Sequence, residues 1–475
     1  MNPLNMCNVR TSSRSMMIMM AWVTIISVSF FSYFMVDKTN KLPRYTLQKS
    51  QPENPSQESA TRLLHNTSLS NLSSTPSTNP HVLKIEYHQE FYNQHWAVNC
   101  EAILSDDKKE IAHVDEILQN EKQKSNKGEI EIAADSLVAN FTQDCEYYRT
   151  FREYPTKVLS KEEKGFPLAF IILAHKNAAQ VELLLRAIYQ PHNVYALHPD
   201  GKSPPEFRRA IKSIANCFDN VFVCSKLERV QYAGFSRLIA DINCMRDLIK
   251  HPVHWKYVIN QCGEAFPLKT NLEMVQIIKA YHGRVDAESY DAPHKLSRFH
   301  KLSPRYNDFS NTEERLKRYP PPGNITLHSG NAYNTLSREF VDYVLTDEES
   351  VKFLSWINMT YSPDEHFWAS LRRYYKAPGS YPNATHKDIN TCFVKWGGES
   401  TFKTCIGKFV RGICVIGTGY ISYVARLPHL FLNKIHYSYD PVTLQCLQEL
   451  LTNRTLHTEL THQYYQEFPP IRAWY

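Results

Sequence analysis

The feature that most constrains the fold of this chain is an alternation of short apolar runs with amphipathic stretches, which begins at Pro167. Four runs have the length and composition of buried strands: "PLAFIILAH" from Pro167, "NVYALH" from Asn193, "NVFVCS" from Asn220 and "KYVIN" from Lys256. Segments with helical periodicity, such as "AAQVELLLRAIYQ" and "SRLIADINCMRDLIK", separate them. Buried strands that alternate with crossover helices predict an α/β fold with a mostly parallel sheet and helices on both faces.

Polar residues fall at or soon after the carboxyl ends of these predicted strands, where ligands bind in such sheets. They are His175, Asp200 and Tyr232. A residue of this kind is, by itself, more often a loop residue or a helix cap than a ligand, so it is the shared placement of the three that favours a binding site. The chain has no G-x-G-x-x-G fingerprint, no P-loop, and no Asp-X-Asp triplet that would hold a divalent metal against a diphosphate. We therefore expect no metal site.

The amino-terminal part predicts a membrane anchor. Residues 16–36, "MMIMMAWVTIISVSFFSYFMV", carry no charge over 21 positions. A helix of that length crosses about 30 Å of hydrocarbon, and a signal peptide would have a shorter apolar region and a small-residue cleavage site. We expect an uncleaved signal anchor at 16–36, a cytosolic tail at 1–15, a polar stem at 37–95 and a lumenal domain at 96–475.

The glycosylation sequons indicate which side of the membrane the body of the chain occupies, because all of them follow the apolar segment. Eleven cysteines agree with an oxidising compartment. The formal charge of +6, on 54 basic and 48 acidic residues, is a mild excess that gives no support to nucleic-acid binding. The sequon asparagines are Asn66, Asn71, Asn140, Asn324, Asn358, Asn383 and Asn453.

The stretch "TYSPDEHFW", which starts at Thr360, contains the best candidate for a catalytic base. Glu365 has Phe367 and Trp368 as neighbours, which could exclude water and raise its affinity for a proton. The alternative interpretation is that Pro363, Asp364 and Glu365 begin a helix, where acidic residues are favourable. Both interpretations can hold at once, and we assign Asp364 to the helix start.

Two cations in the carboxyl third could stabilise a departing diphosphate without a metal. They are Arg411, in "GKFVRGICVIG", and Lys434, in "HLFLNKIHYSYDP". An Arg side chain can bind two phosphate oxygens at once, and a Lys adds a compact charge. The alternative is that both are ordinary surface cations.

From about Val98 to about Leu450 the chain resembles a known family, the β-1,6-N-acetylglucosaminyltransferases of core 2 and I branching (glycosyltransferase family 14). The resemblance is carried in order by "VNC", "LSKEEKGFPLAFIILAHK", "LLRAIYQPHNVYALH", "NCFDNVFVCSKLERVQYAGFSRLIADINCMRDL", "WKYVINQCGEAFPLKTN", "YSPDEHFWA", "RGICVIG" and "LFLNKI". It implies a type II Golgi membrane protein with a lumenal GT-A-like domain that needs no metal. Its partners would be UDP-GlcNAc, glycan acceptors on glycoproteins and the Golgi membrane, and a homodimer is left open.

The resemblance also implies roles for individual residues. Glu365 would take the proton from the C6 hydroxyl of a GalNAc or Gal residue, which attacks GlcNAc with inversion to form a β-1,6 bond. Core 2 acceptors are favoured, with core 4 and I-branching acceptors as alternatives. Arg411 and Lys434 would hold the diphosphate. The remaining donor-site positions would be His175, Asp200 and Tyr232, and the acceptor-site positions Glu288, Lys295, Arg298 and Trp396.

The family pairing of cysteines implies three disulfides here: Cys100 with Cys446, Cys145 with Cys217, and Cys405 with Cys414. A fourth family bridge would join Cys244 to the position that Ala196 occupies. Because that partner is missing, Cys224, at the end of the next predicted strand, is our hypothesis for the replacement. Cys262 matches a free thiol of the family, and Cys392 has no evident partner.

Two departures and two rival interpretations bear on function. Trp396 is followed by Gly397 and Gly398, whereas core 2 enzymes have Trp-X-Tyr, which weakens a core 2 assignment.

A protein xylosyltransferase would carry a further carboxyl-terminal domain. An inactive Golgi glycan-binding protein would have no need of Glu365, Arg411 and Lys434 together.

Overall fold

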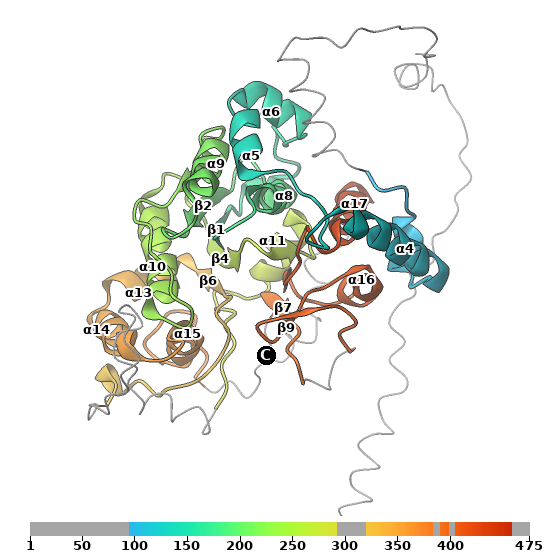
Figure 1. Ribbon diagram of the computed structural model, residues 1–475. Helices are drawn as coiled ribbons and strands as arrows, with labels where there is room; N and C mark the ends of the chain where they lie inside the picture. Colours follow the sequence, from blue (N-terminus) through green and yellow to red (C-terminus); the bar gives the residue numbers. More distant parts are fainter. Residues whose placement is uncertain (1–94, 292–319, 383–389, 399–403, 458–475) are drawn as a thin grey trace, which may run out of the picture. The chain divides into compact units, whose positions relative to one another are not determined.

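A five-stranded sheet with the order β3-β2-β1-β4-β6 forms the centre of the computed structural model (Figure 1), which describes residues 95–291, 320–382, 390–398 and 404–457. Three strand pairs are parallel, and β6 joins the edge antiparallel to β4. This confirms the predicted parallel-rich α/β sheet. The strands are β1 (Leu168–Ala174), β2 (Val194–Pro199), β3 (Val221–Val223), β4 (Tyr257–Cys262) and β6 (Thr335–Ser337).

Strand β1 shows why this sheet needs helices on both of its faces. Every residue of β1 is buried, and successive side chains point to opposite faces. Phe170 and Ile172 enter one core, whereas Ala169 and Ile171 enter the other. Figure 1 shows the two helical layers on either side of the sheet.

The helices of each layer follow from these two cores. The first core is covered by α5 (Asp135–Phe141), α6 (Cys145–Phe151), α8 (Ala178–Ile188), α9 (Pro205–Ala215) and α11 (Asn271–Lys279). The second is covered by α10 (Phe235–Lys250), α13 (Arg338–Thr346), α14 (Glu348–Trp356) and α15 (Asp364–Arg372). Both helices that the periodicity predicted are present, as α8 and α10.

A second, smaller sheet with the order β5-β10-β7 lies beside the first and was not predicted, because each of its strands has only three residues. Together with four helices it encloses a third core. The strands are β5 (Ala265–Pro267), β7 (Cys392–Val394) and β10 (Phe431–Asn433), and the helices are α3 (Cys100–Leu104), α4 (Lys108–Lys124), α16 (Thr418–Val424) and α17 (Pro441–His457). Short elements complete the fold: α7 (Lys161–Lys164), η2 (Pro322–Asn324), η3 (Ile357–Met359), and the hairpin of β8 (Phe409–Val410) with β9 (Ile413–Cys414).

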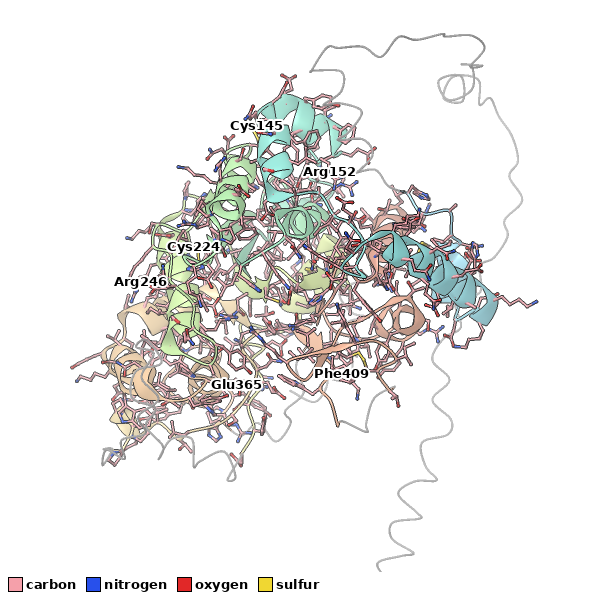
Figure 2. All side chains as sticks on the ribbon, viewed as in Figure 1. Cys145, Arg152, Cys224, Arg246, Glu365 and Phe409 are labelled. Atoms are coloured by element: carbon pink, nitrogen blue, oxygen red, sulfur yellow. A yellow bond between two sulfur atoms is a disulfide. The ribbon has the colours of Figure 1, made fainter. Side chains whose placement is uncertain are left out.

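The described residues contain four disulfides, and they are the four pairs expected above. Cys224 follows β3 and Cys244 lies on α10, so their bond joins the edge of the sheet to the helix that covers it. Figure 2 marks Cys145 and Cys224. Cys262 and Cys392 are the free cysteines of the described residues.

Several predictions fall on residues that the structure does not describe. These include the tail, the anchor and nearly all of the stem, as well as Asn66, Asn71 and Asn383. Among the helices of the described residues, none is both long and apolar enough to cross a bilayer. The four described sequon asparagines are all exposed, as glycosylation requires: Asn140, Asn324, Asn358 and Asn453.

Candidate active site

Three loops meet at the carboxyl edge of the central sheet, and each carries polar side chains. His175 and Lys176 follow β1, Asp200 follows β2 and Glu264 follows β4. Two backbone hydrogen bonds fix the loops to each other: the Asp200 amide donates to the Ala174 carbonyl at 2.8 Å, and the Gly263 amide donates to the Leu173 carbonyl at 2.9 Å. The predicted placement of His175 and Asp200 at one edge is therefore confirmed.

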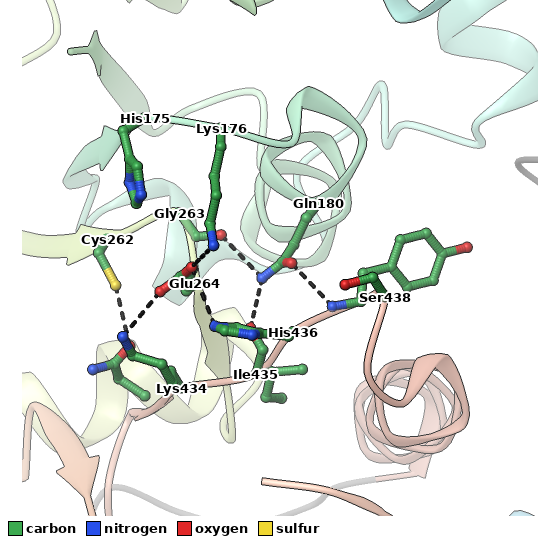
Figure 3. A network of polar contacts seen from close by, with 12 residues as sticks. His175, Lys176, Gln180, Cys262, Gly263, Glu264, Lys434, Ile435, His436 and Ser438 are labelled. Carbon is green, nitrogen blue, oxygen red and sulfur yellow. Dashed lines mark hydrogen bonds and ion pairs between the residues drawn. The ribbon is translucent and has the colours of Figure 1, made fainter. Parts of the chain in front are cut away.

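Glu264 lies at the centre of a cationic cluster (Figure 3). Its carboxylate is 2.9 Å from Lys176 Nζ, 3.2 Å from Lys434 Nζ and 3.2 Å from His436 Nε2. Burial alone would raise the pKa of Glu264, but the hydrogen bond with His436 and the charge of Lys434 hold it well below the ordinary value. These neighbours therefore favour the ionised form of Glu264.

His175 stands beside this cluster in Figure 3. Its side chain is exposed, yet the surrounding protein removes enough water to lower the pKa of the ring. The charges of Glu264 and Asp200 act in the opposite direction, and that of Arg411 acts in the same direction. His175 is therefore under the electrostatic influence of both Asp200 and Arg411.

Arg411 occupies the tip of the β8–β9 hairpin. Arg411 and Gly412 form its two-residue turn with φ values of 52° and 79°. Left-handed backbone suits glycine, so an arginine at this position is strained, as often occurs at functional sites. The guanidinium carbon lies 5.1 Å from the centre of the Tyr232 ring, which is a cation–π distance. Two predicted donor-site residues are thereby brought together.

Asp200 helps to place the loop that carries Tyr232. One carboxylate oxygen of Asp200 accepts hydrogen bonds from the amides of Lys202, at 2.8 Å, and Val230, at 3.1 Å. Tyr232 itself is 60% exposed, so its ring projects from this loop into solvent. Asp200 therefore has a structural function in this site in addition to any contact with a ligand.

Glu365 lies in the first turn of α15, which begins at Asp364 with Pro363 at its cap, as predicted. Its side chain is half-buried. The preceding Ser362 has a left-handed backbone, with φ of 49°, and its amide donates to the Ala233 carbonyl at 2.8 Å. Because Ala233 directly follows Tyr232, this bond joins the Glu365 loop to the Tyr232 loop.

The two aromatic neighbours of Glu365 hold its helix in place. Phe367 and Trp368 are fully buried in the second core, where Phe367 stacks on Phe353 with ring centres 5.5 Å apart. They anchor α15 to the sheet, and that anchoring fixes the position of Glu365. Asp364 is also buried, which raises its pKa, while the charge of Arg237 lowers it.

Gly330 connects Glu365 to Glu288, a predicted acceptor-site residue. The Gly330 amide donates to the Glu365 carbonyl at 2.7 Å. A Cβ atom at Gly330 would lie 1.9 Å from the Glu288 carbonyl oxygen, so the Glu288 backbone directly covers this glycine. Gly330 is thus the single residue that lies between the backbone of Glu365, the candidate base, and the backbone of Glu288, the acceptor-site candidate.

This contact predicts that Gly330→Ala is strongly destabilising. Both clashing groups are backbone, so the site cannot relax by rotating a side chain, and we expect a loss of at least about 2 kcal/mol in the free energy of unfolding. Urea unfolding monitored by fluorescence would measure it. Gly165→Ala is a matched control, because a Cβ atom there meets its nearest neighbour at an ordinary 3.5 Å. Equal stability of the two variants would contradict the proposed contact.

Trp396 lies beside the Arg411 hairpin, to which its segment pairs. The Gly397 amide donates to the Gly412 carbonyl at 2.8 Å, and the Trp396 side chain is 43% exposed. Gly398 has a left-handed backbone with φ of 84°, and among the described residues no atom lies within 4 Å of where its Cβ atom would be. Phe409 belongs to β8 of this hairpin, is 49% exposed and lies near Gly397. Figure 2 labels Phe409 and Glu365.

Four residues of this site were not predicted from the sequence: Lys176, Glu264, Gly330 and His436. Glu264 follows β4 in the same way that His175 follows β1, so the strand-end rule could have found it. Gly330 had no comparable signal, because its neighbours come from distant segments. Lys295 and Arg298 lie outside the described residues. No group of three or more His, Cys, Asp or Glu side chains in the described part of the chain is arranged to hold a metal ion.

A parallel-rich α/β domain with a basic cluster and a helix-start carboxylate at the carboxyl edge of its sheet has the layout of a glycosyltransferase. Residues 168–425 match the family described as "Branch: Core-2/I-Branching enzyme", and the chain belongs to this family. The resemblance drawn from the motifs is thereby confirmed.

Known relatives agree with this assignment. The human "Beta-1,3-galactosyl-O-glycosyl-glycoprotein beta-1,6-N-acetylglucosaminyltransferase 3" is 39% identical over 378 residues, which are 77% of this chain and 85% of the relative. The human "N-acetyllactosaminide beta-1,6-N-acetylglucosaminyl-transferase" is 42% identical over 323 residues, 67% of this chain and 80% of the relative. The X-ray structure of the mannosyltransferase Ktr4p from S. cerevisiae covers 56% of this chain and 81% of its own, with 10% identity and a TM-score of 0.22, too low to carry an argument.

Proposed function

We propose that this protein transfers GlcNAc from UDP-GlcNAc to the C6 hydroxyl of a GalNAc or Gal residue in a glycan, with inversion and without a divalent metal. The observation that carries the proposal is the linkage of the Glu365 loop to both other parts of the site. Through Gly330 it reaches Glu288, and through Ser362 and Ala233 it reaches Tyr232 beneath Arg411. Contacts through the backbone therefore connect the candidate base Glu365 to the acceptor-site candidate Glu288 and to the loop beside Arg411.

In this mechanism Glu365 takes the proton of the C6 hydroxyl while that oxygen attacks the anomeric carbon from the face opposite UDP. Lys434 and Arg411 offset the charge that develops on the departing diphosphate, and Lys176 lies close enough to Lys434 to assist. These cations take the place that a divalent ion has in other nucleotide-sugar enzymes, and the lack of an Asp-X-Asp triplet supports this proposal. The domain would adopt a GT-A-like arrangement in the Golgi lumen, anchored by residues 16–36.

The acceptor can be either of two sugars. The GalNAc of an O-glycan is favoured because the named O-glycosyl-glycoprotein relative matches over the longer segment. The Gal of a poly-N-acetyllactosamine chain is the second candidate. It is favoured by the Gly397–Gly398 pair after Trp396, where core 2 enzymes have a tyrosine.

A transfer assay tests the proposal and its independence of metal. The full chain is incubated with UDP-GlcNAc and with acceptors that end in Gal or GalNAc, with EDTA or with manganese. We expect a β-1,6-linked product, identified by linkage analysis, at rates that differ by less than about twofold between the two conditions, because fixed cations need no exchangeable ion.

The outcomes separate the parts of the proposal. A product with another linkage, or no product with any acceptor, would overturn the reaction itself. A rate that collapses in EDTA and returns with manganese would overturn only the metal-free mechanism. The acceptor that reacts fastest decides between O-glycan and poly-N-acetyllactosamine branching.

A further inference from the structure

Glu264 has no role in the proposed transfer, although it lies among the cations that transfer requires. Its side chain is 14% exposed and contacts Lys176, which follows β1, and Lys434 and His436, which both lie on the segment after β10. In Figure 3 the three side chains converge on this carboxylate. A half-buried carboxylate is therefore paired with one of the groups that would bind the diphosphate of the donor.

Lys434 does not depend on Glu264 for the position of its backbone. It directly follows β10, which pairs with β5 on one side and β7 on the other. The Lys434 carbonyl accepts a hydrogen bond from the Ile416 amide at 2.9 Å, and the next residue, Ile435, donates to the Glu264 carbonyl at 2.9 Å. Gln180 Nε2 also donates to the Ile435 carbonyl, at 2.8 Å. The backbone frame thus holds this lysine without the Glu264 side chain.

We propose that Glu264 is an internal counter-ion that competes with the diphosphate of the nucleotide for Lys176 and Lys434, and thereby limits nucleotide affinity and speeds UDP release. This inference rests on the proposed donor-binding function of Lys434. Without nucleotide, Glu264 offsets the mutual repulsion of the cations. When the diphosphate binds, the lysines turn to its oxygens, and they return to Glu264 when UDP leaves. The carboxylate also repels the bound diphosphate directly.

Glu264→Gln tests this competition, because it removes the charge and keeps the shape. We expect UDP to bind the full-length variant about tenfold more tightly than the wild-type protein, as measured by calorimetry. The dissociation of UDP should slow by a similar factor. A variant that binds UDP as weakly as the wild type, or more weakly, would overturn the proposal, because a purely structural function for Glu264 predicts lost affinity.

Two further variants complete the test. Glu264→Asp keeps the charge, but its shorter side chain holds that charge farther from the two lysines. The weaker competition should tighten UDP binding by about threefold. If Glu264→Gln does not fold, this variant decides, and unchanged or weaker binding by it would overturn the proposal. Glu162→Gln is the matched control: Glu162 pairs with Lys279 at 2.7 Å, and its helix α7 precedes the start of β1 at the opposite edge of the sheet. It should leave UDP affinity unchanged.

The experiment also separates this inference from the proposed function. Failure of the wild-type protein to bind UDP would overturn the donor-binding function and the inference together. Binding by the wild type, combined with weaker binding by Glu264→Gln, would overturn the inference alone.

Discussion

Glu365→Gln is expected to reduce transfer by roughly a thousandfold while UDP affinity stays within about twofold of the wild-type value, because the amide cannot accept the acceptor proton. Gln has nearly the same shape as Glu, and α15 is anchored by Phe367 and Trp368 rather than by Glu365. The loss should therefore appear in the rate of transfer and not in folding. Initial rates with UDP-GlcNAc and an acceptor, together with calorimetry with UDP, measure the two effects separately.

Glu339→Gln is a matched control for this prediction. Glu339 is the second residue of α13, as Glu365 is of α15, and it is exposed. Both changes remove an acidic group from a helix start, which is worth only about 0.3–1 kcal/mol. Near-normal transfer by Glu365→Gln, or an equal loss in both variants, would show that Glu365 is not the base.

Lys434→Ala is expected to weaken UDP binding about a hundredfold, because a charged contact with the diphosphate is lost. The affinity for uridine, which has no phosphate, should not change. Calorimetry with both ligands measures the difference and locates the effect at the diphosphate. Glu264 keeps Lys176 and His436 as partners in this variant, so the fold should be retained.

The matched control for Lys434→Ala is Lys408→Ala. Lys408 also pairs with a glutamate, Glu129, at 3.0 Å, but its side chain is 37% exposed. Loss of that ion pair should leave the affinity for UDP unchanged, because exposed pairs contribute little. If Lys434→Ala binds UDP like the wild type, the lysine does not hold the diphosphate, and the metal-free mechanism loses its main support.

Much of the fold could be predicted because its signals are local. The apolar runs that became β1, β2 and β4 each lie within a few residues of the predicted position, and the Pro363–Asp364 start of α15 depends only on neighbouring residues. The short strands β5, β7 and β10 carry no periodicity that could be read. They form only because distant segments meet, and that meeting places Lys434.

For the site, too, local signals identify single residues, whereas the contacts between them depend on the fold. His175, Asp200, Arg411 and Glu365 could be named individually, since strand ends, cations and acidic helix starts are visible in the sequence. Which of the candidate residues contact each other could not be predicted. Tyr232 lies under Arg411 only because a strained hairpin turn aims the arginine at it. Glu264 meets Lys434 only because the loop after β4 lies next to the segment after β10.

By itself the sequence determined the class of the fold, the family and the candidate groups for catalysis, because these depend on periodicity, composition and short motifs. Only the tertiary structure decided which groups act on each other: the carboxylate of Glu264 on the lysines, and the glycine that joins Glu288 to Glu365. Such contacts depend on strand register and loop closure over long separations, and no local pattern in the chain encodes them.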